Sequence, residues 1–247
     1  MADYRTVRTG AAAGARSAQI DEGLRAHMNK VYGTMSVGMF LTFLVAWAVG
    51  SSPELLGIFR DPETLQPNIL GWIVMFAPLI MVFAFGAAIN RLSAAGAQTF
   101  FYAFAAIMGL SLSWIFVAFT GISIAQVFLI TSISFAGLSL WGYTTKKDLS
   151  GWGTFLMMGV IGLVVASLVN IFLQSPAIYF AVSVLGVLIF AGLTAYDTQS
   201  IKNEYIEHAR HGDSEWLGKS AIMGALRLYL DFINMFMFLL QLFGQRE

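Results

Sequence analysis

The sequence predicts an all-α membrane protein with seven transmembrane helices. Hydrophobic residues make up 57% of the 247 residues, charged residues only 11%, and the mean hydropathy is +0.72. Soluble domains are about a quarter charged, so this much apolar surface requires lipid as its solvent. The apolar residues also fall into seven runs of about 20. A helix of that length, rising ~1.5 Å per residue, crosses a hydrocarbon core of ~30 Å.

The N-terminal segment, residues 1–30, is predicted to be a flexible tail. It is polar, with Ala, Gly, Ser and scattered arginines, and it has few large apolar residues that could form a core. No short apolar stretch precedes a cleavage-like site, so a secretory signal is not expected. The chain would therefore divide into a tail, residues 1–30, and a transmembrane domain, residues 31–247.

The seven transmembrane helices follow in order along the rest of the chain. The long first connection has three prolines and is expected to be a loop, whereas the charged segment 199–220 could extend the sixth helix. Arg227 and Asp231 interrupt the last run, which could therefore re-enter the membrane instead of crossing it. No alternation of polar and apolar residues is sustained, which argues against a β-barrel. The spans are expected near 31–50, 70–90, 98–118, 122–142, 153–173, 177–198 and 221–243.

The positive charges predict the orientation. Of the fourteen Lys and Arg residues, eleven fall in segments on the same side as the N-terminus and two fall on the opposite side. Cytoplasmic segments are enriched in Lys and Arg, so we expect the N-terminus to be cytoplasmic. The short connections and the absence of a signal suggest a bacterial inner membrane.

Charges at membrane depth are the candidate functional residues. Asp197, Arg227 and Asp231 are the ionisable residues other than tyrosine within the predicted spans, and Arg91 ends the second span. Intramembrane charges are rare and face a partner, water or the bundle interior. With the predicted orientation, all four residues lie in the cytoplasmic half of the bundle.

The paired carboxyl groups suggest a pH-sensitive site. Two carboxylates in a medium of low dielectric constant cannot easily both ionise and would share a proton. When deprotonated, such a pair could hold Arg91 or a cation, or it could activate water for peptide hydrolysis. Three simpler readings stay open. Arg227 and Asp231, one turn apart, could neutralise each other; Asp197 could hydrate a helix end; Arg91 could be a topology signal.

Other site types and partners find little support. The chain has no cysteine, which excludes disulfides and thiolate metal sites, and we expect no cofactor. His208 and His211 have no third ligand nearby in the sequence and are expected to be solvated. The net charge of zero argues against nucleic acid as a partner.

Two stretches resemble a known family. "AYDTQSIK" and "LYLDFINMFMFLLQLFG" resemble the end motifs of the Bax inhibitor family, and "KKDLSGWGTFL" is similar to its inner loop. The resemblance covers roughly residues 30–245 and implies a seven-helix fold with the seventh helix at its centre. It also implies a pH-regulated calcium leak.

The resemblance further implies roles for individual residues. Asp197 and Asp231 would correspond to the family's paired aspartates, which form the pH sensor and contact calcium. Arg91 would correspond to an arginine that latches Asp197. Arg227 departs from the family, whose members often have a small, apolar or acidic residue at this position. A cation one turn from Asp231 should favour its ionised form and compete with calcium, so we expect Arg227 to modulate the site.

The favoured hypothesis is a pH-sensitive calcium leak channel whose partners are the lipid bilayer and calcium ions. The alternative is a membrane-embedded regulator that binds other membrane proteins or a protease complex in stress or cell-death control. An intramembrane aspartyl protease is disfavoured because its Gly-x-Gly-Asp and Pro-Ala-Leu motifs are absent. We therefore do not expect an enzyme.

Overall fold

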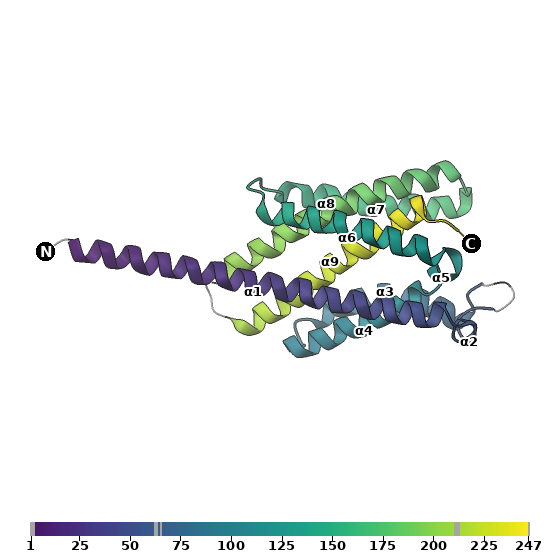
Figure 1. Cartoon of the computed structure of the whole chain (residues 1–247), viewed down its shortest axis with the longest axis horizontal. Coiled ribbons are helices and arrows are strands. Elements are labelled where there is room, and N and C mark those ends of the chain that lie inside the picture. The colour runs from purple at the N-terminus through teal and green to yellow at the C-terminus, as the bar shows by residue number, and fades with distance from the viewer. Residues whose placement is uncertain (1–2, 62–63, 65, 210–212, 247) are drawn as a thin grey trace.

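The computed structural model describes the backbone of residues 3–61, 64, 66–209 and 213–246, and side chains from residue 20 onward. In this part of the chain, seven helices are long and apolar enough to cross a membrane, which confirms the predicted fold class. Two further helices, α2 and α5, are short. The helices are α1 (Asp3–Gly50), α2 (Pro53–Leu56), α3 (Ile69–Ala88), α4 (Ala94–Leu112), α5 (Ile115–Ala118), α6 (Gly121–Thr144), α7 (Ser150–Leu173), α8 (Pro176–His208) and α9 (Ser214–Phe243) (Figure 1).

Most of the long helices begin at a side chain that caps their first turn. Asn68, Ser93, Thr120, Ser175 and Asp213 each accept a hydrogen bond from the backbone N–H three residues later, at the start of α3, α4, α6, α8 and α9. The first N–H groups of a helix have no intrahelical acceptor, so such caps stabilise the helix start. The helices therefore begin at polar residues slightly before the predicted apolar runs.

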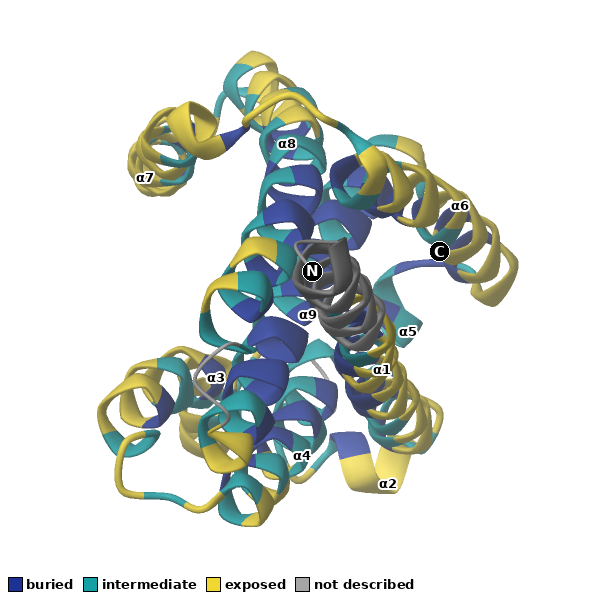
Figure 2. Cartoon of the chain, turned by 90° about the vertical axis from the view of Figure 1, so that its left-hand side faces the viewer, coloured by how far each residue is buried: buried dark blue, intermediate teal, exposed yellow. Residues whose placement is uncertain are grey.

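Helix α9 is the centre of the bundle. It packs against α8, α1, α6 and α4, and 67% of its membrane-length window is buried, against 11% for α3 and for α7. Figure 2 shows α9 in the middle with α3 and α7 at the periphery. The helix runs without a break for 30 residues, about 45 Å, so it is long enough to cross the bilayer and does not turn back. The structure therefore favours a crossing helix over a re-entrant one.

Helix α8 continues past its apolar run into the charged segment 199–220, which the sequence analysis allowed. Its 33 residues correspond to about 50 Å, which exceeds the hydrocarbon core by several turns. Its last turns, which include Glu204 and Tyr205, therefore extend past the apolar part of the bundle and provide a surface on which α1 packs.

The boundary of the predicted tail at residue 30 is too late. Leu24, His27 and Met28 of α1 are buried, and the ring of His27 lies 4.9 Å from that of Tyr205. The reason is the extension of α8, which provides packing partners that the apolar pattern alone does not indicate. The rest of the predicted tail is residues 1–19. Residues 1–2 and the side chains of residues 3–19 lie outside the described part of the structure.

Candidate functional site

The structure brings the two predicted aspartates together where α8 packs on α9. The carboxyl group of Asp197, from α8, is close enough to that of Asp231, from α9, for the two to interact electrostatically. Asp231 is only 4% exposed, and no described group donates a hydrogen bond to its Oδ2 atom. An unpaired buried carboxylate is costly, and a proton shared between the two carboxyl groups would supply the missing donor. We call Asp197 and Asp231 the aspartate pair.

The polar residues around Asp197 are accommodated within α8 itself. The hydroxyl of Thr194 donates to the carbonyl of Phe190 at 2.8 Å, and that of Thr198 donates to the carbonyl of Thr194 at 2.7 Å. Both threonines are fully buried, so these bonds avoid the cost of unpaired hydroxyl groups in the bundle. The helix can therefore place a polar stretch at the α8–α9 contact while it remains regular.

The loop between α6 and α7 is attached to α8 two residues after Asp197. The side chain of Gln199 donates to the carbonyl of Lys147 at 2.8 Å and accepts from the backbone N–H of Leu149 at 2.8 Å. Sequence reasoning missed this contact between the "KKDLSG" loop and the "YDTQ" motif. Because a buried glutamine amide that both donates and accepts fixes its backbone partners, the loop is held against α8.

Arg227 pairs with a carboxylate that sequence reasoning missed. Its guanidinium group donates to both oxygens of Glu204, with Nη1 2.7 Å from Oε1 and Nη2 3.3 Å from Oε2. The simpler reading that was left open, in which Arg227 and Asp231 neutralise each other, is therefore not supported, because the ion pair that forms joins Arg227 to Glu204. Glu204 lies two helical turns after Asp197, on the same face of α8. That seven-residue spacing is the signal that could have identified it.

Arg227 still acts on the aspartate pair at longer range, since its charge interacts with both Asp197 and Asp231. The site is thus a row of alternating charge along the α8–α9 contact, with one arginine between Glu204 and the aspartate pair. The charge of Glu204 also acts on Asp197. A guanidinium already bound to one carboxylate neutralises its neighbours only in part.

The structure does not bring Arg91 to the aspartate pair. Arg91 lies in the exposed turn after α3, and α3 packs on α4 at the edge of the bundle. Within the described part of the chain, Arg91 forms no ion pair with either aspartate. The physical reason is the peripheral position of α3, which places the end of this helix away from the α8–α9 contact.

The carboxyl groups do not form a closed metal site. Among residues 20–61, 64, 66–209 and 213–246, no group of three or more His, Cys, Asp or Glu side chains is arranged to hold a metal ion. Calcium takes six to eight oxygen ligands, so two carboxylates would leave much of its shell to water. The ring of His208 stacks on Trp216 at 3.8 Å between centroids, and His211 lies outside the described residues.

Comparisons with known proteins identify the family. A family model described as "Inhibitor of apoptosis-promoting Bax1" matches residues 24–247. The inner membrane protein YbhL of Escherichia coli K12 is 46% identical over 225 residues, which cover 91% of this chain and 94% of YbhL. An uncharacterized protein of Caulobacter vibrioides is 44% identical over 91% of this chain and 90% of its own length.

The similarity extends over the whole chain in another relative. The uncharacterized protein RP147 of Rickettsia prowazekii is 39% identical over 247 residues, which cover all of both chains. The family model covers α1 from residue 24 onward and all of the other helices that pack around α9. The chain therefore belongs to the Bax inhibitor family of membrane proteins.

Proposed function

We propose that this protein is a pH-sensitive leak pathway for cations, with calcium as the transported ion, in a bacterial inner membrane. The proposal is supported above all by one observation: the buried carboxyl group of Asp231 has an oxygen to which no described group donates, and the second carboxyl group, that of Asp197, is near enough to interact with it. The description of YbhL as an inner membrane protein supports the location. The Bax inhibitor family is not a known enzyme family, and we assign the protein no enzymatic role.

The aspartate pair would act as sensor and ion contact at the same time. With a shared proton the pair has a single negative charge and both carboxyl groups are satisfied. Loss of that proton leaves two negative charges at membrane depth, which only a cation can balance. The guanidinium of Arg227, held by Glu204, is the resident competitor for that role. The pair would therefore exchange a proton for a metal ion as the pH changes.

Arg91 would act as a latch only in another conformation, because its turn is exposed and α3 lies at the edge of the bundle. In the arrangement described here, Arg227 is the arginine whose charge acts on both aspartates. For Arg91 to latch Asp197, α3 would therefore have to move toward α8.

Calcium flux into proteoliposomes across a pH series tests the proposal. We expect the flux of the unchanged protein to vary by about tenfold with pH, which corresponds to about 1.4 kcal/mol in the barrier. Asp197→Asn and Asp231→Asn should each flatten this profile, because one carboxyl group cannot share a proton with an amide. The control is Asp148→Asn, an exposed carboxylate in the α6–α7 loop. Unchanged profiles in both aspartate variants would refute the sensor role.

A further inference from the structure

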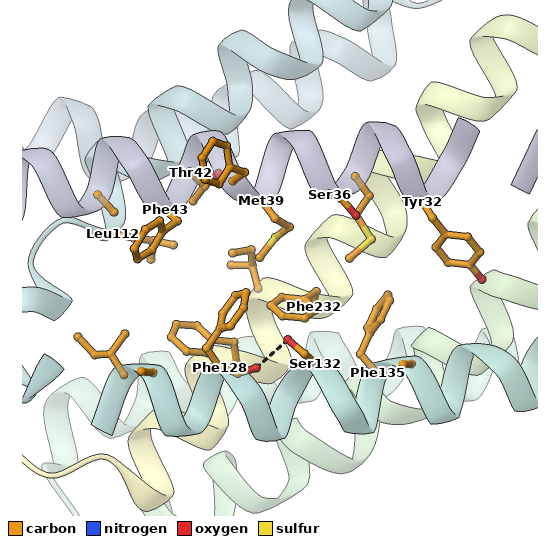
Figure 3. Close-up of a pocket in the computed structure, with 18 of the residues that line it drawn as sticks. Tyr32, Ser36, Met39, Thr42, Phe43, Leu112, Phe128, Ser132, Phe135 and Phe232 are labelled. Atoms are coloured by element: carbon orange, nitrogen blue, oxygen red, sulfur yellow. Dashed lines mark hydrogen bonds between the residues drawn. The ribbon is translucent and has the colours of Figure 1, made fainter. Parts of the chain in front are cut away.

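A large cleft separates α1 from α6, with α9 as its floor. Its volume is about 1340 Å³, more than the 300–1,000 Å³ typical of small-molecule pockets. Figure 3 shows Met39 and Phe43 of α1 facing Phe128 and Phe135 of α6, with Phe232 of α9 behind them. The lining runs along α1 from Arg25 to Trp47, about 33 Å of helix, so the cleft extends across the depth of the bundle.

The cleft is separate from the aspartate pair. Helix α9 presents Phe232, Ile233 and Phe236 to the cleft, whereas Asp231 faces α8. Between the two sites lies a chain of hydroxyl groups. Tyr32 Oη is 2.5 Å from Ser139 Oγ, which is 2.9 Å from Oγ1 of Thr198. No carboxylate lines the cleft and most of its lining is apolar, so the cleft suits an apolar molecule better than a metal ion.

The cleft opens toward the region that lipid occupies. Both of its walls are membrane-length helices, and its rim residues Phe40 and Leu140 are 62% and 64% exposed. Water gains little in a space lined mainly by Phe, Met, Ile and Leu. The apolar molecules that surround such a protein are lipid acyl chains.

One end of the cleft has the polar groups that a lipid headgroup requires. Arg25 and Asn29 line this end, and both are exposed. An arginine binds phosphate oxygens through two parallel N–H groups, and basic pockets between helices on the cytoplasmic side bind anionic headgroups. The predicted orientation places Arg25 on that side.

We propose that the cleft binds an anionic phospholipid, with acyl chains between α1 and α6 and the phosphate at Arg25 and Asn29. The lining mixes bulky side chains such as Met39, Phe43 and Phe128 with small ones such as Ser132 and Ala136. Flexible acyl chains can follow such an uneven surface.

Lipid titration of the purified, delipidated full chain in detergent tests the proposal, with bound lipid counted by native mass spectrometry. Phosphatidylglycerol should be retained in preference to phosphatidylcholine. Ser132→Phe fills the cleft from α6 and should weaken phosphatidylglycerol binding by about tenfold. The matched control is Ser134→Phe, two residues along the same helix and not part of the lining, which should bind as the unchanged protein does.

The headgroup contact is tested separately. Arg25→Gln should weaken phosphatidylglycerol binding by about fivefold, the effect of one cation near an anionic lipid, and leave phosphatidylcholine binding unchanged. Lys30→Gln, on the same helix but outside the lining, is the matched control. An equal loss of phosphatidylglycerol binding in both variants would overturn the assignment of Arg25 to the headgroup contact, because it would show only a general effect of positive charge.

Two further outcomes would overturn the proposal. One is equal binding of phosphatidylglycerol by Ser132→Phe and by its control. The other is a dimer of the chain that Ser132→Phe abolishes, since a second copy would then occupy the cleft. If Ser132→Phe does not fold, Ser36→Leu fills the cleft from α1, where Ser36 is exposed, and the same criteria apply.

Discussion

Helices α9 and α7 are both long enough to cross a membrane, yet they occupy opposite environments. Helix α7 has a hydropathy of 2.5 and is 11% buried, whereas α9 has a hydropathy of 1.5 and is 67% buried. In a soluble protein the more apolar helix would be the buried one. In a bilayer the solvent is itself apolar, so the polar side chains are the ones that gain from facing protein. Low hydropathy therefore identifies the centre of this bundle.

The comparison predicts that loss of an aromatic ring costs far more on α9 than on α7. Tyr229 is fully buried between the rings of Phe101 and Phe104, each 5.6 Å away, and its hydroxyl lies 2.6 Å from Oγ1 of Thr42. We expect Tyr229→Ala to lower the free energy of unfolding in mixed micelles by about 3–5 kcal/mol. Phe155→Ala on α7, where the ring is 74% exposed, should cost less than about 0.5 kcal/mol. Similar losses would break the comparison.

A pair of glycines extends the comparison to close helix contacts. A Cβ atom on Gly142 of α6 would lie 2.3 Å from the carbonyl oxygen of Ala195 in α8, whereas one on Gly162 of α7 would meet nothing within 4 Å. Gly142→Ala should therefore destabilise the bundle by about 1–3 kcal/mol. Gly162→Ala should stabilise it by up to about 1 kcal/mol, because alanine favours the helix. The two substitutions should change the free energy of unfolding in opposite directions in the same assay, and changes in the same direction would contradict this expectation.

The Arg227–Glu204 ion pair and the buried Asp231 differ in exposure, although both lie at the α8–α9 contact. Both side chains are about one-third exposed, so solvent screens their attraction. A double-mutant cycle with Arg227→Gln and Glu204→Gln should give a coupling energy of at most about 1 kcal/mol. A much larger coupling would mean that the pair is as deeply embedded as Asp231.

The smallest effect is expected at the beginning of α7. Hydrogen bonds with Ser150 hold the pKa of Asp148 below its usual value. The carboxylate therefore stabilises the folded state at pH values above its unfolded pKa of about 3.9 and loses this effect as the pH falls through the lower folded value. Asp148→Ala should slightly lower the midpoint of thermal unfolding at pH 7, and the difference should shrink near pH 3. A constant difference would refute an electrostatic cause.

Hydropathy and length were sufficient to predict the seven spans. Each long apolar run became one helix, except that the run near 98–118 divides into α4 and the short α5. The central position of α9 followed from the family resemblance. The first boundary could not be read from the pattern. Leu24 and Met28 are isolated apolar residues in a polar segment, and they are buried only because α8 continues past its own apolar run.

The aspartate pair was also predictable, because charged side chains at membrane depth face the interior of the bundle. The charged groups that surround the pair were not predictable. Arg227 could bind Asp231 on its own helix, α9, or Glu204 on α8, and the rotation of α8 against α9 decides between them. The position of Arg91 depends on which helices surround α9, and the sequence of a single chain does not specify that order.

The polar character of α9 bears on how the protein is made. On insertion scales, an arginine or aspartate near a helix centre costs about 2.5–3.5 kcal/mol, so Arg227 and Asp231 make the last helix a poor candidate to enter the bilayer alone. Its buried faces need α1, α4, α6 and α8 as neighbours. The ribosome synthesises those four helices before α9. Helix α9 can therefore insert last, into a bundle in which its packing partners are already present.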